Sequence, residues 1–369
     1  MGIELVENVK LGDKLDEEVL TPLGGVLFHK GRIVMQKELD ILQAFLITHV
    51  TLEEEKTKDG KTGESNAEEK PSQNASKQTT NKQAAMKQTP TSPLQQEYDN
   101  MVQLLRETYN TFVSGQNMPI MDIRVQMEKL LQQLSSYNIL KFVPISFQER
   151  DYLLHNSVAC AMTSYMLAQW VNIPQREWMQ VALAGLLKDI GNIRINRAIL
   201  TNPKPLSAGE QEEMKRHTVL GYQMLKSVAA LNEGVKLSAL QHHEKIDGTG
   251  YPLGIDSTKI HPYARIVSIA DIFHAMTLNK AYRKAASPYL VLEQIQSDAF
   301  GKLDPAYVRI FVQKTTQFHN GTVVRLSDKR IGEIVFSDQT HPTRPWVSIN
   351  GSIVNLVQER NLYIEEVIK

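Results

Sequence analysis

The stretch LQHHEKIDGTGYP, residues 240–252, places two adjacent histidines and a glutamate directly before a glycine-rich turn. The histidines end an apolar run, and Asp247, Gly248 and Gly250 favour tight backbone geometry. His242 and His243 are therefore packing residues, caps or metal ligands. The choice between these interpretations depends on whether the rest of the chain supplies further metal ligands.

Composition narrows the class of protein. With 42% hydrophobic and 22% charged residues among 369, the chain has ordinary globular composition and room for roughly two to three domains. A formal net charge of zero gives no sign of nucleic-acid binding. The lone Cys160 excludes an internal disulfide and a thiolate zinc site, which fits a reducing compartment. Because no apolar run approaches the roughly 18 residues of a membrane span and no signal-peptide pattern is present, we expect a cytoplasmic protein.

One segment separates a small N-terminal unit from the rest of the chain. From Glu53 to Pro93 there is no Val, Ile, Leu, Phe, Tyr or Trp. Such a segment buries too little apolar surface to offset the entropy of ordering, so we predict a disordered polar linker at residues 53–94. Residues 1–52 form a small α/β unit, with short β-like runs, turns at Leu11–Asp13 and Leu23–Gly25, and a helical stretch around Lys37–Ile47.

Residues 95–316 have the apolar spacing of helices. Ser146-x-x-Glu149 and Ser207-x-x-Glu210 predict capping boxes, and Pro174 predicts the start of a helix that stops at Gly191. After Phe318 the pattern changes to short β-branched runs with turns at Ser327–Asp328 and Asn350–Gly351. Residues 317–369 are therefore predicted to form a small β module.

Several polar residues fall on otherwise apolar helical faces of this region. A carboxylate or imidazole there is unfavourable unless it is paired or bound to a metal. Taken singly, each is most simply a cap, a core-edge residue or one member of an ion pair. Taken together, imidazole and bridging carboxylate ligands suit one or two divalent ions such as iron, manganese or zinc. The candidates are Asp151, His155, Asp189, His217, His242, His243 and Asp271.

These motifs carry a resemblance to a known family. KDIGN at 188–192, His217, HHEKIDGTGYP at 242–252 and ADIFHAMTLNKAYR at 270–283 resemble the HD-GYP family in order and spacing. Its members are helical metallo-phosphodiesterases of the HD superfamily that hydrolyse cyclic di-GMP in bacteria. The resemblance covers about residues 147–311, the core of the helical domain. It implies a mainly α fold: an all-helical HD-type metal-dependent phosphohydrolase domain with small β-containing N- and C-terminal units.

The resemblance also implies roles for single residues. His155 corresponds to the histidine of the first ligand helix, and Asp151 to an acidic ligand that some members add for a third metal. Asp189 corresponds to the aspartate of the HD pair, which bridges two metals. The remaining roles are His217, His242 and His243 for the second metal, Asp271 for the first, and Asp247, Gly250, Tyr251, Lys280 and Arg283 for the substrate. One or two divalent ions, iron or manganese in particular, are the implied cofactors.

Two departures from the family bear on activity. Lys188 stands where the HD pair has its histidine, and a protonated ammonium has no lone pair to give a metal. Asn192 stands where the family has a lysine that helps to stabilise the scissile phosphate, and loss of such a group reduces rates by about 10²–10³ elsewhere. The ligand set of the second metal survives both changes. Alternatively, Lys188 supplies part of the positive charge of the missing ion without ligating anything.

Three hypotheses remain open. In the first, the chain is a phosphodiesterase in which water activated at Asp189 and the metals attacks phosphorus while Lys280 and Arg283 hold the ligand. In the second, hydrolysis is lost, and the domain binds cyclic di-GMP, a related cyclic dinucleotide or a metal and signals to a protein partner through the terminal units. In the third and weakest, the polar residues form a structural network. Lys188 favours impaired or lost hydrolysis, and the sequence leaves the oligomeric state open.

Overall fold

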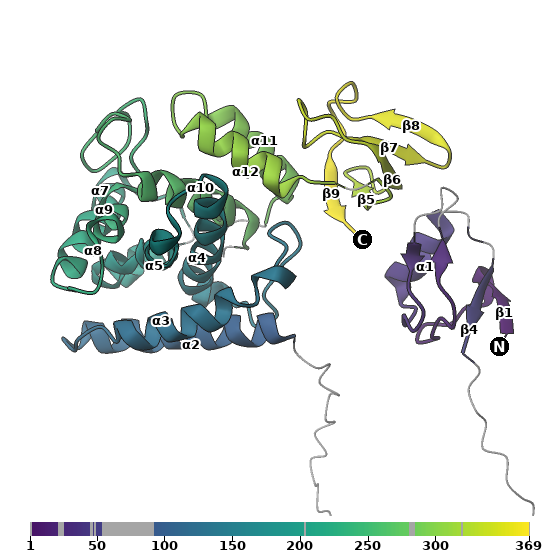
Figure 1. Cartoon of the computed structure of the whole chain (residues 1–369), viewed down its shortest axis with the longest axis horizontal. Coiled ribbons are helices and arrows are strands. Elements are labelled where there is room, and N and C mark those ends of the chain that lie inside the picture. The colour runs from purple at the N-terminus through teal and green to yellow at the C-terminus, as the bar shows by residue number, and fades with distance from the viewer. Residues whose placement is uncertain are drawn as a thin grey trace, which may run out of the picture.

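The computed structural model describes residues 2–20, 26–44, 47, 49–53, 92–202, 204–279, 285–318 and 320–368. As predicted, an all-helical domain is accompanied by a small N-terminal unit and a C-terminal β-sheet (Figure 1). The predicted linker falls almost wholly on residues 54–91, and the predicted turn at Leu23–Gly25 on residues 21–25; both lie outside the described residues. In the described part of the chain, no helix is long and apolar enough to cross a membrane.

The helical domain starts with a hairpin of two helices. α2 (Pro93–Val113) begins at a cap in which the Ser92 hydroxyl accepts a hydrogen bond from Gln95, and α3 (Ile120–Leu131) packs beside it (Figure 1). The elements that follow are η2 (Leu134–Ser136), η3 (Glu149–Asp151), α4 (Tyr152–Trp170), η4 (Gln175–Glu177), α5 (Trp178–Leu187), η5 (Ile190–Arg194), α6 (Arg197–Leu200), α7 (Ala208–Lys215), α8 (His217–Lys226), α9 (Glu233–Gln241), α10 (Pro262–Thr277), α11 (Pro288–Asp298) and α12 (Pro305–Thr315).

The domain is built around α4, α5 and α10. α4 is buried along most of its length, as an apolar sequence without a polar face requires. α5 packs tightly against it because Gly185 lacks a side chain: a Cβ there would overlap the carbonyl of Cys160 and the hydroxyl of Ser164. α10 packs on both helices. The residues that follow α5, and one face of α10, thereby carry polar side chains into the interior.

The predicted helix starts had different outcomes. The capping box of Ser207 and Glu210 is confirmed at the start of α7. The box predicted at Ser146 is wrong, because its hydroxyl donates to Asp99 of α2 and α4 begins only at Tyr152. The helix predicted from Pro174 begins as the 3₁₀ turn η4 and becomes α-helical at Trp178.

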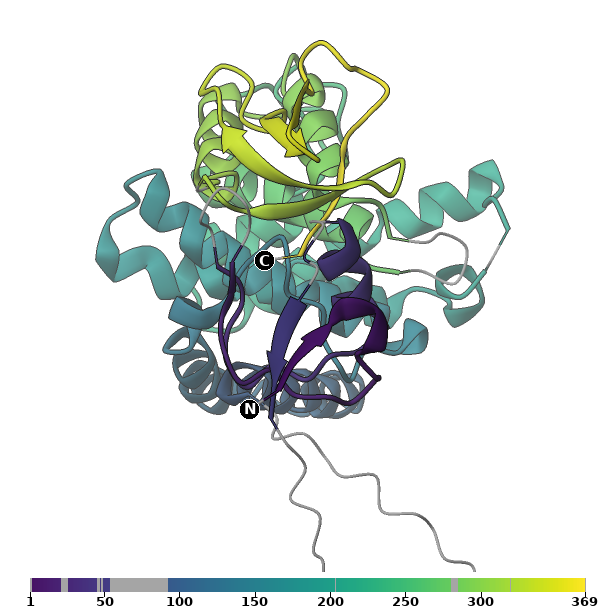
Figure 2. The same ribbon diagram turned by 90° about the vertical axis from the view of Figure 1, so that its right-hand side faces the viewer.

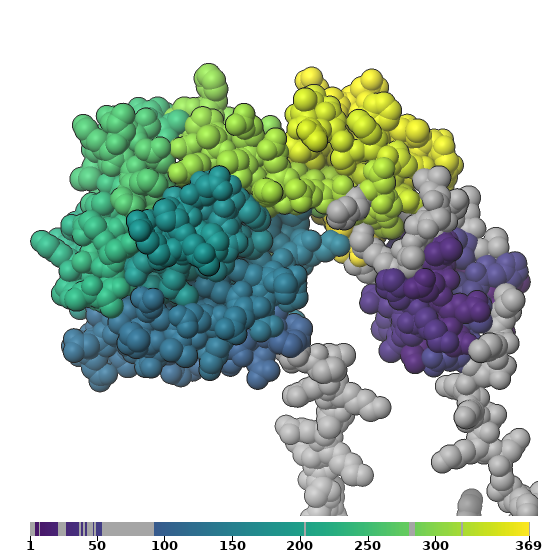
Figure 3. All heavy atoms as spheres, viewed as in Figure 1, coloured from purple at the N-terminus to yellow at the C-terminus, as the bar shows by residue number. Residues whose placement is uncertain are grey.

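The C-terminal module is a five-stranded antiparallel sheet in the order β8-β7-β6-β5-β9. Its strands are β5 (Val323–Leu326), β6 (Ile331–Phe336), β7 (Trp346–Ile349), β8 (Ser352–Asn355) and β9 (Ile364–Val367). Asn350 and Gly351 both have positive φ and form the predicted turn between β7 and β8. The sheet meets the helical domain at α11, where Tyr289 joins its apolar core, and Figure 3 shows the two parts in continuous contact.

The N-terminal unit contains two small antiparallel pairs, β1 (Gly2–Leu5) with β4 (His49–Leu52) and β2 (Val19–Leu20) with β3 (Val26–Phe28). η1 (Val6–Asn8) and α1 (Gln36–Ala44) complete it, the helix beginning one residue before the predicted stretch. Its core, which includes Leu15 and Ile41, also takes in Val323 and Ile331 of the C-terminal sheet. The first and last parts of the chain therefore share one apolar cluster, and Figure 2 shows them side by side.

Candidate metal and ligand site

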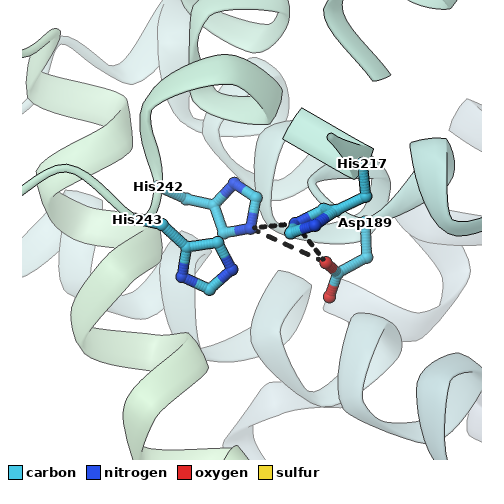
Figure 4. A group of neighbouring side chains, drawn as sticks. All are labelled: Asp189, His217, His242 and His243. Carbon is cyan, nitrogen blue, oxygen red and sulfur yellow. Dashed lines mark hydrogen bonds and ion pairs between the residues drawn. The ribbon is translucent and has the colours of Figure 1, made fainter. Parts of the chain in front are cut away.

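Four polar side chains meet where helices end or begin. Asp189 follows the end of α5, His217 is the first residue of α8, and His242 and His243 follow α9. One potential ligand atom from each lies within 4.8 Å of those of the other three. Figure 4 shows Asp189, His217 and His242 pointing toward one another, with His243 beside His242. Imidazole and carboxylate groups gathered in this way are the donor set of a transition-metal site.

A glycine sets the approach of two of the elements that carry this cluster. Gly191 in η5 lies against the first turns of α8, where a Cβ would overlap the carbonyl of His217 and the backbone nitrogen of Gly221. Only glycine permits this approach. It holds Asp189, two residues earlier, close to the start of α8.

The histidine tautomers are fixed by backbone carbonyls. Nδ1 of His217 lies 2.7 Å from the carbonyl oxygen of Met214, and Nδ1 of His242 lies 3.0 Å from that of Ser238. A carbonyl can only accept, so each Nδ1 carries the proton and each Nε2 keeps a free lone pair. Burial lowers the pKa of His217, which favours the neutral form that a metal needs.

The distances fit a bound cation. The two Nε2 atoms are 3.4 Å apart, and Oδ1 of Asp189 lies 3.4 Å from that of His217 and 3.6 Å from that of His242. Ligands about 2.1 Å from a tetrahedral ion are separated from one another by about 3.4 Å. Two unprotonated nitrogens facing each other are unfavourable without a cation or a water proton between them. These residues therefore fit a divalent ion, and Asp189, His217, His242 and His243 would hold it.

The glycine-rich turn is fastened to the cluster. The ring of Tyr251 stacks on that of His243, with centroids 4.7 Å apart, and its backbone N–H donates to the His243 carbonyl. The buried Glu244 accepts from the backbone N–H groups of Leu253, at 2.6 Å, and Ile255, at 3.2 Å. At Gly250 a Cβ would overlap the backbone of Glu244. The glycine-rich turn therefore packs closely against His243 and Glu244.

Two residues of this region were not predicted from the sequence. Glu244 clamps the turn, and the ammonium of Lys215 lies 5.8 Å from the centre of the Tyr251 ring, within range of a cation–π interaction. The available signal was their position: Glu244 directly follows His243, and Lys215 lies two residues before His217.

Lys188 occupies the other side of Asp189. Its side chain is completely buried, and its ammonium contacts Oδ2 of Asp189 and lies 2.9 Å from Oδ1 of Asp271 on α10. Burial alone would lower the pKa of Lys188, but the charges of Asp189 and Asp271 outweigh it and raise its pKa well above the ordinary value. Burial opposes ionisation of Asp189, yet the charge of Lys188 holds its pKa well below the usual range. Both groups are therefore charged at neutral pH.

Asn192, the second departure from the family, also faces the cluster. Its Nδ2 donates to Oδ1 of Asp189 at 3.2 Å. Its Oδ1 is buried and has no hydrogen-bond partner in the described part of the chain. A buried acceptor of this kind calls for a bound water or ligand.

The other predicted site residues lie elsewhere. His155 is outside the cluster: its Nδ1 lies 3.2 Å from the hydroxyl of Tyr98 on α2. Asp151 forms an ion pair with Arg106, 3.0 Å away. Asp247 is exposed and accepts from the backbone and hydroxyl of Thr249, which shapes the glycine-rich turn. Lys280 and Arg283, predicted to contact the substrate, lie outside the described residues.

A buried histidine near the site makes stability depend on pH. His274 contacts the hydroxyl of Thr163 at 2.7 Å, and burial lowers its pKa from 6.5 to about 3. Between these values the unfolded chain binds a proton that the folded chain does not, so the unfolding free energy falls as pH falls, by about 1.4 kcal/mol per pH unit. His274→Gln can keep the hydrogen bond to Thr163 and cannot titrate. We measure the unfolding free energy in urea, with a chelator present, as a function of pH. Below pH 6.5 the slope for the variant should be smaller than that for the native chain by about 1.4 kcal/mol per pH unit, the contribution of one proton. Equal slopes for the two chains would contradict the assignment.

Comparisons with known proteins agree with the motifs. The family model described as HD domain matches residues 136–307, which include the whole cluster. A cyclic di-GMP phosphodiesterase of Pseudomonas aeruginosa is 30% identical over 53% of this chain and 47% of its own length. A second, from Borreliella burgdorferi, is 26% identical over 58% of each. The chain thus spans about half the length of these curated relatives.

A solved structure is also similar. It is described as an HDG"Y"P protein from Bdellovibrio bacteriovorus and aligns with 84% of this chain and 97% of its own, at 14% identity and a TM-score of 0.49. The matched helical region, the curated relatives and the HHE-x-x-DG-x-GYP signature lead to the same conclusion. Residues 136–307 of this chain are therefore an HD domain by similarity to that family, and the signature within them resembles that of its HD-GYP branch.

Proposed function

We propose that this chain binds cyclic di-GMP or a related cyclic dinucleotide at a single divalent ion and hydrolyses it slowly. The observation that carries the proposal is the cluster of Asp189, His217, His242 and His243, whose Nε2 lone pairs and carboxylate oxygen converge beside the glycine-rich turn. Iron or manganese suits this donor set. The names of the relatives support the choice of ligand, since curated relatives act on cyclic di-GMP and others on 3'3'-cGAMP.

The residues of the chain have separable roles in this proposal. Such an ion, when bound, polarises a phosphoryl oxygen and lowers the pKa of a bound water. The Met214 and Ser238 carbonyls orient the two histidine rings. Tyr251 presents an aromatic face next to His243. Lys280 and Arg283 contact the phosphates or guanine, as the family resemblance implies.

Impaired hydrolysis follows from two substitutions. Asn192 leaves an uncharged amide where the family has a lysine to stabilise developing charge. Lys188 cannot ligate a metal while its ammonium is bound to two carboxylates. The alternative, a binding module with no hydrolysis that signals through the terminal units, is favoured by the shared core of the N-terminal unit and the C-terminal sheet.

The proposed site makes a direct prediction about metal binding. His242→Ala removes one ligand and leaves Nε2 of His217 without its neighbour, so we expect Mn²⁺ affinity to fall by at least about 100-fold. Binding of cyclic di-GMP in the presence of Mn²⁺ should fall with it. Both are measured by isothermal titration calorimetry on the full chain.

The matched control is His341→Ala, an exposed histidine of the C-terminal module that contacts Asp338. It should bind metal and cyclic di-GMP as the native chain does. The proposed function is refuted if the native chain binds neither cyclic di-GMP nor 3'3'-cGAMP with Mn²⁺ present.

A further inference from the structure

We propose that the ammonium of Lys188 occupies the position of a second metal ion, so that this site holds one divalent ion beside a permanent cation of the chain. The inference rests on the metal site of the proposed function and not on the identity of the nucleotide. Three observations support it: the two oxygens of Asp189 face different partners, Lys188 is buried, and the other candidate ligands lie outside the cluster.

The two oxygens of Asp189 face different groups. Oδ1 lies 3.4 and 3.6 Å from the Nε2 atoms of His217 and His242, while Oδ2 contacts the ammonium of Lys188. A carboxylate that bridges two metals divides its oxygens in the same way. Here the second partner of the carboxylate is a side chain.

The ammonium has the contacts that a cation at this position requires. Besides Asp189 it pairs with Asp271 at 2.9 Å, and the side chains of these aspartates are only 12% and 13% exposed. A second divalent ion would have to displace a fully buried ammonium or lie against it, and both are unfavourable. The lysine therefore neutralises the carboxylate pair and excludes a second ion.

Two other candidate ligands of a second ion lie outside the cluster. The ring of His155 contacts the Tyr98 hydroxyl, and Asp151 pairs with Arg106. Neither belongs to the metal-ligand cluster found among the described residues. The nearby carboxylates, Asp189 in the cluster and Asp271 beside it, are already paired with Lys188.

The test is the number of ions that one chain binds. The full-length chain and its variants are loaded anaerobically with Mn²⁺, freed of loose metal, and measured by elemental analysis and electron paramagnetic resonance. We expect one Mn²⁺ per native chain with the spectrum of an isolated ion. Asp271→Asn should also hold one ion with little change in affinity, because Asp271 pairs with Lys188 and does not ligate the bound ion.

Lys188→His exchanges the ammonium for a ligand and should gain a second, more weakly held ion with a spin-coupled spectrum. Two coupled ions in the native chain would overturn the inference, and so would loss of the single ion in Asp271→Asn. If the native chain and His242→Ala alike bind no ion, the metal site of the proposed function fails instead. The Asp271→Asn result remains decisive if Lys188→His does not fold.

Discussion

Replacing Lys188 by histidine and Asn192 by lysine in one chain will raise the rate of cyclic di-GMP hydrolysis by at least about 100-fold over the native chain. Lys188→His replaces a buried ammonium by an imidazole whose lone pair can bind a metal. Asn192→Lys places a positive charge near Oδ1 of Asp189, the oxygen that Asn192 contacts in the native chain. Both groups that the family uses at these positions are thereby present.

The measurement is hydrolysis under anaerobic conditions with Mn²⁺ or Fe²⁺, followed by separation of the linear dinucleotide and GMP. His242→Ala on the double-variant background should abolish the gain. Lys188→Met with Asn192→Lys is the matched control, since it removes the ammonium without supplying a ligand, and it should remain slow. Rapid hydrolysis by the native chain that His242→Ala abolishes would show that Lys188 is compatible with catalysis.

The elements that local sequence controls were predicted well. Apolar spacing indicated the helical region, and the β-branched runs with Asn350–Gly351 indicated the C-terminal sheet. The capping box at Ser207 is a contact within a single turn, so its residues alone could specify it. At Ser146 the same pattern failed because Asp99, on a distant helix, takes the hydroxyl. A local sequence pattern fails to predict a cap where a residue from another helix binds the capping side chain.

In the candidate site, too, local motifs were predicted and tertiary partners were not. The histidines of the cluster and Asp189 belong to motifs with fixed spacing, and the structure brings their ligand atoms together. The partners of His155 and Lys188 are not encoded nearby: Tyr98 comes from α2 and Asp271 from α10. The sequence showed that Lys188 cannot ligate a metal, but only the fold shows that it joins two carboxylates. The shared core of the two terminal units was equally hidden, because an apolar face does not specify what covers it.

Replacing Lys188 by methionine will destabilise the metal-free protein by about 3–5 kcal/mol, because two nearly buried carboxylates then lose their common counter-charge. Methionine has similar length and no charge, so the loss reports the ion pair more than the packing. Unfolding in urea with a chelator, followed by the circular dichroism of the helices, gives the free energy. Lys215→Met is the control: that lysine is 41% exposed and pairs with Glu212, and its loss should change stability by less than about 1 kcal/mol.

The double variant Lys188→Met with Asp271→Asn tests the origin of that loss. If the destabilisation comes from unpaired charge, removing one carboxylate along with the ammonium should recover part of it, with a coupling free energy of at least about 1 kcal/mol. Additive losses would mean that Lys188 stabilises the fold through packing alone. A positive coupling would mean that the chain has a fixed ammonium at the point where two carboxylates would otherwise require a metal ion to stay buried.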